Sequence, residues 1–185
     1  RLTWKYFTDF SRQGANLSPA QKETLSALNQ QLATLYTRFS QNLLADEEQK
    51  MLVIERQEDL AGLPEALVVA ARAAAERAGH PGKWVIANTR SSMEPFLVYA
   101  SNRVLREQGF KLWTSRGDFG DANDNNAIAS EILVLRARKA KLLGFETFAH
   151  WQLSNTMAAE PRNAMDLMTR VWKAARTAFL GDVAE

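Results

Sequence analysis

Cysteine is absent from this chain of 185 residues, and histidine occurs only twice. Without cysteine the chain forms no disulfide, supplies no thiolate ligand to a metal and has no cysteine nucleophile. Neither His80 nor His150 has a second histidine four residues away, which is the spacing that a helical zinc hydrolase motif requires. We expect His80 to be a solvated turn residue and His150 to face a packed interface or solvent. The expected set of catalytic residues, cofactor-binding residues and metal ligands in this chain is therefore empty.

Long apolar runs are also missing, and none approaches the ~20 residues that a membrane-spanning helix needs. The first residues, 2–10, mix apolar and polar side chains and so lack the uninterrupted apolar core of a signal peptide. We expect no membrane partner. Because the chain opens at Arg1 in what reads as the middle of a helix, we expect it to be a fragment of a longer protein.

A large excess of one charge is the third absence, since 23 Lys and Arg residues stand against 21 Asp and Glu residues, which gives a net charge of +2. That balance argues against a nucleic-acid partner, although the pI is about 9.0. Four cations do gather in one segment: Arg136, Arg138, Lys139 and Lys141. Leucines interleave with them, which favours a helix with one solvated face over a phosphate-binding surface.

The composition and the apolar periodicity indicate a globular, mainly α fold. Hydrophobic residues make up 46% and charged residues 24% of the chain, enough to form a core. Apolar positions recur three and four residues apart, which predicts helices over 2–12, 19–45, 64–78, 126–143 and 147–153, with a last helix from Pro161. Short β-capable segments lie at 51–54 and 84–87. We expect residues 1–185 to form a single multi-helix domain with at most one small two-stranded β element.

Two helix starts carry a capping signature. Ser18 followed by Pro19 and Gln21 predicts one capping box, and Ser91 with Glu94 predicts another. The second would open a helix that runs past Leu105, with a possible interruption at Gly109.

Oxygen-bearing side chains crowd the loop 118–126. Three of them stand at alternate positions: Asp121, Asn123 and Asn125. An EF-hand loop that begins at Asp121 requires Gly at its sixth and Glu at its twelfth position, and this sequence has Asn126 and Ile132 there. We therefore expect no calcium site. Instead, Asp124 or Asn125 is predicted to accept hydrogen bonds from the first amides of the next helix.

Several short segments follow one another in a fixed order along the chain. They are 17–19, 39–43, 60–64, 102–107, 124–125, 131–136, 139–145, 148–149 and 157–158. This succession resembles the helical region that precedes the catalytic domain in thimet-oligopeptidase-type zinc metallopeptidases. Within that family it is most similar to the bacterial peptidyl-dipeptidases (dipeptidyl carboxypeptidases), with oligopeptidase A as a near relative. The resemblance covers most of the chain and depends on the ordered combination of segments.

The resemblance implies a cytoplasmic, almost entirely helical peptidase that is much longer than this chain. Its catalytic half would hold zinc through a His-Glu-x-x-His motif and a later Glu, and short peptides would enter a channel between two halves, with release of C-terminal dipeptides as the expected reaction. The chain contains no such motif. It would thus belong to the non-catalytic half, form a wall of the channel, bind no zinc itself and be inactive without the remaining catalytic half of the same polypeptide.

Two readings of another class stay open, a stand-alone helical interaction module and a nucleic-acid-binding module. A His-Glu-x-x-His motif elsewhere in the parent polypeptide would decide for the peptidase. Under the peptidase interpretation, the last helix should present apolar surface to its missing partner. Its apolar positions are Met165, Met168, Val171, Trp172, Ala175 and Phe179.

Overall fold

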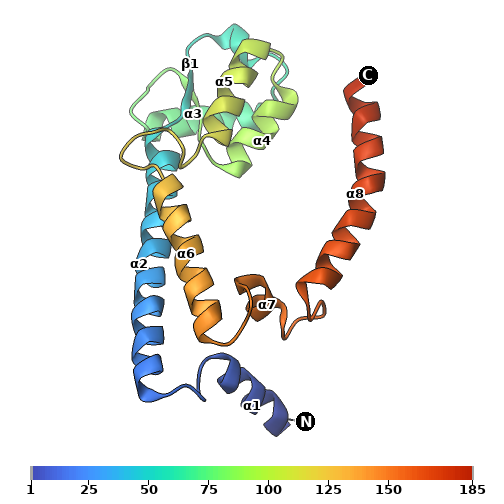
Figure 1. Ribbon diagram of the computed structural model, residues 1–185. Helices are drawn as coiled ribbons and strands as arrows, with labels where there is room; N and C mark the ends of the chain where they lie inside the picture. Colours follow the sequence, from blue (N-terminus) through green and yellow to red (C-terminus); the bar gives the residue numbers. More distant parts are fainter. Residues whose placement is uncertain (1, 185) are drawn as a thin grey trace. The chain divides into compact units, whose positions relative to one another are not determined.

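The computed structural model describes residues 2–184, which form eight α-helices, one short 3-10 helix and one two-stranded sheet (Figure 1). The helices are α1 Leu2–Arg12, α2 Pro19–Gln49, α3 Glu65–Arg77, α4 Arg90–Tyr99, α5 Arg103–Thr114, α6 Asn126–Leu142, α7 Phe148–Leu153 and α8 Pro161–Ala184. The 3-10 helix, η1, is Gln57–Leu60. The predicted fold class is confirmed. Among residues 2–184, no helix combines the length and the apolar character needed to cross a membrane.

The two strands are β1 Leu52–Ile54 and β2 Trp84–Ile86, and they pair antiparallel. Val53 lies opposite Val85 in this pairing. The small β element expected from the sequence is therefore present, and each strand is one residue shorter than the apolar segment that predicted it.

Contacts divide the chain into two units. Unit 1 takes the residues up to Ala33 together with those from Glu131 onward, and unit 2 is Thr34–Ser130. The helices α2 and α6 each continue from one unit into the other. That residues 1–185 form a single domain stays a prediction.

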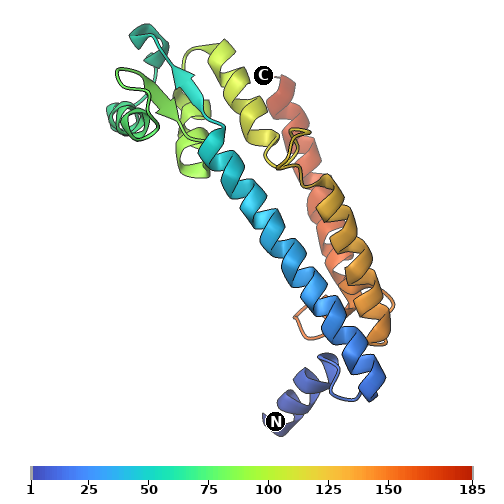
Figure 2. The same ribbon diagram turned by 90° about the vertical axis from the view of Figure 1, so that its left-hand side faces the viewer.

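Unit 1 is built on the leucine stripe of the first half of α2, which faces α6. Figures 1 and 2 show these helices side by side. The buried residues here are Leu25, Leu28, Leu32, Ile132, Leu135 and Ala140. The predicted capping box at the start of α2 is confirmed, since the Ser18 amide donates to Gln21 Oε1 at 3.0 Å and the Gln21 amide donates to Ser18 Oγ at 3.4 Å.

Unit 2 packs α3, α4 and α5 around the two-stranded sheet. Its core includes Ile54, Ile86, Met93 and Phe96, each at most 1% exposed. The alternation along β1 follows from the pleat, because Leu52 and Ile54 point into this core and Val53 does not. The sheet thus supplies one apolar face on which the helices of unit 2 assemble.

The helix predicted to begin near Ser91 and to run past Leu105 is not continuous in the structure. The structure breaks it after Tyr99 and begins α5 at Arg103, whereas Gly109 lies buried inside α5. The break is held by contacts from a distant loop: the Ser101 amide donates to Ala61 O at 2.8 Å, and Asn102 Nδ2 donates to Asp59 Oδ1 at 2.8 Å. Asn102 also caps α5 by accepting from its first amides.

Gly109 serves close packing rather than termination. A Cβ atom at this position would lie 3.0 Å from Met93 Sδ and 3.2 Å from Phe96 Cε1. The glycine therefore lets α5 approach α4 closely, which a sequence pattern cannot distinguish from a helix stop.

The start of α4 also differs from its prediction. The helix α4 begins at Arg90, and its N-cap residue, Thr89, makes no side-chain capping bond. Ser92 Oγ instead accepts a hydrogen bond from the Ala87 amide at 3.1 Å, before the helix starts. The predicted capping box of Ser91 and Glu94 is therefore wrong.

Candidate functional site

An extended exposed apolar surface lies on α8, in unit 1. None of the described residues of this helix is buried. Trp172 is 67% exposed, Phe179 62% and Met168 54%. Their spacing of four and seven residues places them on one side of the helix. The exposed apolar face predicted for the last helix is confirmed, and a face of this size on a folded protein indicates an interaction surface.

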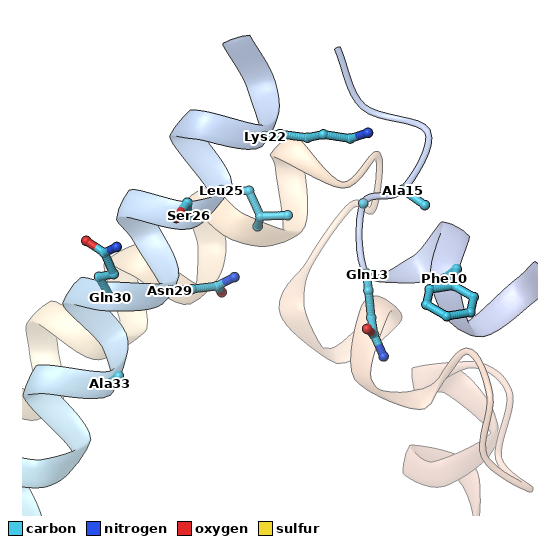
Figure 3. A pocket seen from close by; sticks show the side chains of 10 residues that line it. Phe10, Gln13, Ala15, Lys22, Leu25, Ser26, Asn29, Gln30 and Ala33 are labelled. Carbon is cyan, nitrogen blue, oxygen red and sulfur yellow. The ribbon is translucent and has the colours of Figure 1, made fainter. Parts of the chain in front are cut away.

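A second feature of unit 1 is a hollow of about 580 Å³ between the end of α1 and the first half of α2 (Figure 3). Its lining residues are Phe10, Gln13, Gly14, Ala15, Lys22, Leu25, Ser26, Asn29, Gln30 and Ala33. Amides, a lysine and an aromatic ring can bind peptide-like groups, but these residues include no carboxylate, histidine or cysteine. The hollow is therefore a candidate binding surface and has no acid–base pair or activated nucleophile for hydrolysis.

The hollow was not predicted from the sequence, because the position of α1 also depends on contacts with residues far along the chain. Arg12 Nε donates to Ser154 Oγ at 2.7 Å, and Trp151 Nε1 donates back to the Arg12 carbonyl at 3.1 Å. At Gly14, whose φ is +98°, a Cβ would lie 2.7 Å from Leu25 Cδ2. Gly14 was the one sequence signal that could have indicated this corner, because glycine permits a positive φ and a close approach of another side chain.

The two histidines do not form a site. They lie in different units, His80 in unit 2 and His150 in unit 1. The His150 ring is 2.8 Å from Thr147 Oγ1 through Nδ1 and 3.7 Å from Glu146 Oε2 through Nε2. Thr147 caps α7, so these contacts organise a helix start. Within residues 2–184, no group of three or more His, Asp or Glu side chains is placed to hold a metal ion. That the chain contributes no ligand stays a prediction.

The polar loop before α6 is used for capping, as predicted for Asp124. Asp124 Oδ1 accepts from the Asn126 amide at 2.8 Å, and its Oδ2 accepts from the Gly120 amide at 3.1 Å. Asn123 also donates its amide to Asp121 Oδ1 at 2.9 Å. These side-chain oxygens are engaged with the backbone of their own loop, which is the arrangement of a turn.

A buried carboxylate anchors that loop to α2, and the sequence pattern did not reveal it. Asp46 is fully buried, and its Oδ2 accepts from the Gly117 amide at 2.7 Å. Lys50 Nζ lies 3.8 Å from the other oxygen of Asp46 and also pairs with Asp121. The hydrogen bond from Lys50 is the main cause that lowers the pKa of Asp121. The cluster fixes a loop and leaves Asp46 no exposed oxygen for chemistry.

The basic segment on α6 is used partly for packing. Lys139 Nζ donates to Asn29 Oδ1 at 2.8 Å and lies 4.9 Å from the centre of the Trp151 ring. Burial lowers the pKa of Lys139. The Arg136 guanidinium lies 4.9 Å from the Phe148 ring. The predicted solvated face therefore holds for the exposed Arg138 and Lys141 and not for the other two cations.

Two pairs of the segments that carry the family resemblance meet in unit 2. Asn125 donates to the Phe39 carbonyl at 3.1 Å and accepts from Asn42 at 2.9 Å, which joins 124–125 to 39–43. The Ser101 amide and the Asn102 side chain likewise donate hydrogen bonds to residues in the stretch 59–61. These residues position helices and loops, and none of these contacts is a reactive pair.

Two comparisons with known proteins are informative, one with sequence profiles and one with individual relatives. Residues 96–184 match the sequence profile described as Peptidase family M3. The chain is related to peptidase family M3. The predicted resemblance is thereby confirmed, and the match includes α5, α6, α7 and α8.

Individual relatives agree with this assignment. The chain is similar to the dipeptidyl carboxypeptidase of Escherichia coli, at 36% identity over 90% of this chain and 24% of that protein. It is also similar to oligopeptidase A of Haemophilus influenzae, at 32% identity over 91% of this chain and 25% of that protein. A probable cytosolic oligopeptidase A of Arabidopsis thaliana shows 32% identity over 93% of this chain and 25% of its own length. The chain thus spans about a quarter of the length of these M3-type relatives.

Proposed function

We propose that this chain is a non-catalytic segment of a zinc-dependent peptidase that cleaves short peptides, with release of C-terminal dipeptides as the expected reaction. The observation that supports it is the relationship to peptidase family M3 together with relatives named as a dipeptidyl carboxypeptidase and oligopeptidases A. In this proposal the chain forms a wall of the substrate channel, in a cytoplasmic enzyme.

The residues of this chain do not fit a zinc site. A catalytic zinc needs three protein ligands, commonly two histidines and a carboxylate. Here the two histidines belong to different units, and no suitable group of three lies within residues 2–184. The zinc and the base that activates water would therefore be held by the remaining catalytic half of the same polypeptide, and no catalytic step is assigned to residues of this chain.

The test compares the 185-residue chain with its full-length parent on a short quenched-fluorescence peptide. We expect cleavage by the parent, loss of cleavage with a chelator and recovery with zinc, because the metal polarises the carbonyl and activates water. The chain alone should cleave nothing and should retain no stoichiometric zinc after dialysis.

Three results would contradict this proposal. Chelator-resistant turnover by the parent would exclude zinc catalysis, and turnover by the chain alone would exclude a non-catalytic role. Stoichiometric zinc that is lost in His80→Ala or His150→Ala would show a ligand set in this chain.

A stand-alone interaction module is the second candidate, and the exposed face of α8 is the observation that favours it. It predicts that the parent shows no peptidase activity. The nucleic-acid alternative has less support, because Arg136 and Lys139 lie against aromatic rings.

A further inference from the structure

A small hollow in unit 2 brings two arginines together with an apolar wall. It has a volume of about 390 Å³ and is lined by five residues of α4 and α5, which we call the α4–α5 hollow: Leu97, Arg103, Arg106, Glu107 and Phe110. The last four share one face of α5, because they stand three, four and seven residues after the first of them. The volume lies within the range of ~300–1,000 Å³ that is usual for small-ligand sites.

The two arginines of the α4–α5 hollow have donors that are not used within the chain. Arg106 is fixed in place, because its Nη1 donates to the carbonyls of Ala100 and Ser101 at the end of α4, but its Nε and Nη2 donate to nothing within residues 2–184. Arg103 is exposed, and its side chain forms no hydrogen bond and no salt bridge in the same part of the chain. Both lie in the first turns of α5, where the helix dipole also favours a negative charge. An anion in the hollow would therefore receive charge-assisted hydrogen bonds from two guanidinium groups.

The one carboxylate among the lining residues is already paired. Lys111 Nζ donates to Glu107 Oε1 at 2.6 Å, and this hydrogen bond is the main cause that lowers the pKa of Glu107. With Arg103 and Arg106, these two residues leave a net charge of +2 around the hollow. A singly charged anion suits this balance, because a more highly charged one would be repelled more strongly by Glu107. Glu107 Oε2 forms no hydrogen bond within residues 2–184, so it is left to accept an N–H from a ligand.

Phe110 and Leu97 give the α4–α5 hollow its apolar wall. The Phe110 ring is 56% exposed, whereas Leu97 is half-buried and packs against the core of unit 2. An inorganic anion would use the cations and leave this wall in water. The last residue of a peptide would use every feature of the hollow, since its carboxylate pairs with the arginines, its side chain contacts Phe110 and its amide donates to Glu107.

We propose that the α4–α5 hollow binds the C-terminal residue of a short peptide, with its free carboxylate on Arg103 and Arg106 and an apolar side chain against Phe110. This assignment rests on the proposed function, because an enzyme that releases C-terminal dipeptides has to distinguish a free chain end from an interior peptide bond. Arg103 is the residue to test, since Arg106 also holds the end of α4 and its replacement would disturb the fold.

The test measures peptide binding to the full-length parent after a chelator has removed zinc, so that no cleavage occurs. Isothermal titration calorimetry compares the peptide Ala-Ala-Phe with a free C-terminus and the same peptide with a C-terminal amide. We expect Arg103→Gln to weaken binding of the free acid at least about tenfold, because a charge-assisted hydrogen bond is lost, and to change binding of the amide by less than about twofold. Arg138→Gln is the matched control, since it removes an exposed arginine of α6, and it should change neither.

Two further measurements separate the parts of the site. Phe110→Ala should weaken binding of Ala-Ala-Phe more than binding of Ala-Ala-Gly, because only the first peptide places a ring against the apolar wall. In the parent with zinc, Arg103→Gln should raise KM for a peptide with a free C-terminus and change kcat by less than about twofold, as expected for a contact that only binds.

Other outcomes would overturn the proposal. If Arg103→Gln weakens the acid and the amide equally, or weakens neither, the hollow does not bind the chain end. Inorganic phosphate that binds more tightly than the peptide, and no longer binds in Arg103→Gln, would assign the hollow to phosphate. Cleavage is measured on the same parent: acid-specific binding that depends on Arg103 without cleavage would refute the proposed function and leave this site standing, whereas cleavage without that dependence would do the reverse.

Discussion

Gly62 gives a sharp test of how unit 2 is held together. It lies in the turn between η1 and α3, with a φ of +86°. A Cβ at this position would lie 2.3 Å from the Tyr99 carbonyl oxygen and 2.6 Å from Ser101 Oγ. The same turn accepts the Ser101 amide through Ala61 O at 2.8 Å. Gly62→Ala should therefore damage the contact that separates α4 from α5.

The size of the effect follows from three separate costs. A positive φ costs a non-glycine residue about 1–2 kcal/mol. The collision with Tyr99 O adds more, since an oxygen of the backbone must move by roughly 1 Å to restore a normal contact, and such overpacking costs about 1–3 kcal/mol. Losing the bond between Ser101 and Ala61 adds about 1 kcal/mol. We expect a total decrease in the free energy of unfolding of about 3–6 kcal/mol.

Gly79 is the matched control. Its φ is +78°, and a Cβ there would meet nothing within 4 Å. Gly79→Ala therefore carries the conformational cost alone, about 1–2 kcal/mol. Urea denaturation followed by circular dichroism gives both free energies, and amide exchange at Ser101 reports the local contact. Equal destabilisation by the two substitutions, or an unchanged exchange rate at Ser101 in Gly62→Ala, would refute the reasoning.

Two further predictions concern the loop before α6. Asp46→Ala should lower the free energy of unfolding by about 2–4 kcal/mol, because the buried Gly117 amide loses its acceptor. Asp46→Asn should lower it less, and Glu48→Ala, which removes an exposed carboxylate, should change it very little. Equal urea midpoints for the three variants would contradict this prediction. The pair of Asp121 with Lys50 should stabilise the fold above the ordinary carboxyl pKa and lose its effect as pH falls through the lowered pKa of Asp121. Lys50→Met should raise that pKa in an NMR titration, and an unchanged value would refute the assignment.

Helix positions were predictable where the apolar period was long and its ends carried capping residues. The stripe on α2 and the box of Ser18 and Gln21 lie within one stretch of chain, so local sequence contains the whole signal. The last helix is similar, and its exposure was expected under the peptidase interpretation, in which a missing partner would pack against it. Only the C-terminal end of α2 was underestimated, at Ala45 instead of Gln49.

The break between α4 and α5 could not be predicted, because its cause lies 40 residues earlier in the chain. Asp59 and Ala61 receive the hydrogen bonds of Asn102 and Ser101, and no local pattern encodes that meeting. Gly109 was predicted as the possible interruption instead, since glycine in a helical pattern can mark a helix end. Its buried position against Met93 shows the other use of glycine, which depends on what another helix places there.

The same limit applies to the candidate sites. The hollow beside α1 depends on Trp151 and Ser154 binding Arg12, residues at opposite ends of the sequence. Asp46 lies in a helix stretch rich in acids and has no sequence feature that separates it from the exposed Glu48. Burial, which gives Asp46 its importance, is a property of the assembled fold.

Structural requirements can account for the resemblance to a peptidase family, since the contacts that join the resembling segments among the described residues position helices and loops. The resembling segments need their residue types for geometry: Asn102 and Asp124 cap helices, Asn125 joins two elements, and Gly62 allows a close approach. Such requirements restrict sequence as firmly as catalysis does, since each replaced group would leave a buried partner unsatisfied or a contact too short. Family resemblance in this region is therefore a statement about architecture. The proposed peptidase chemistry has to be tested in the full-length parent.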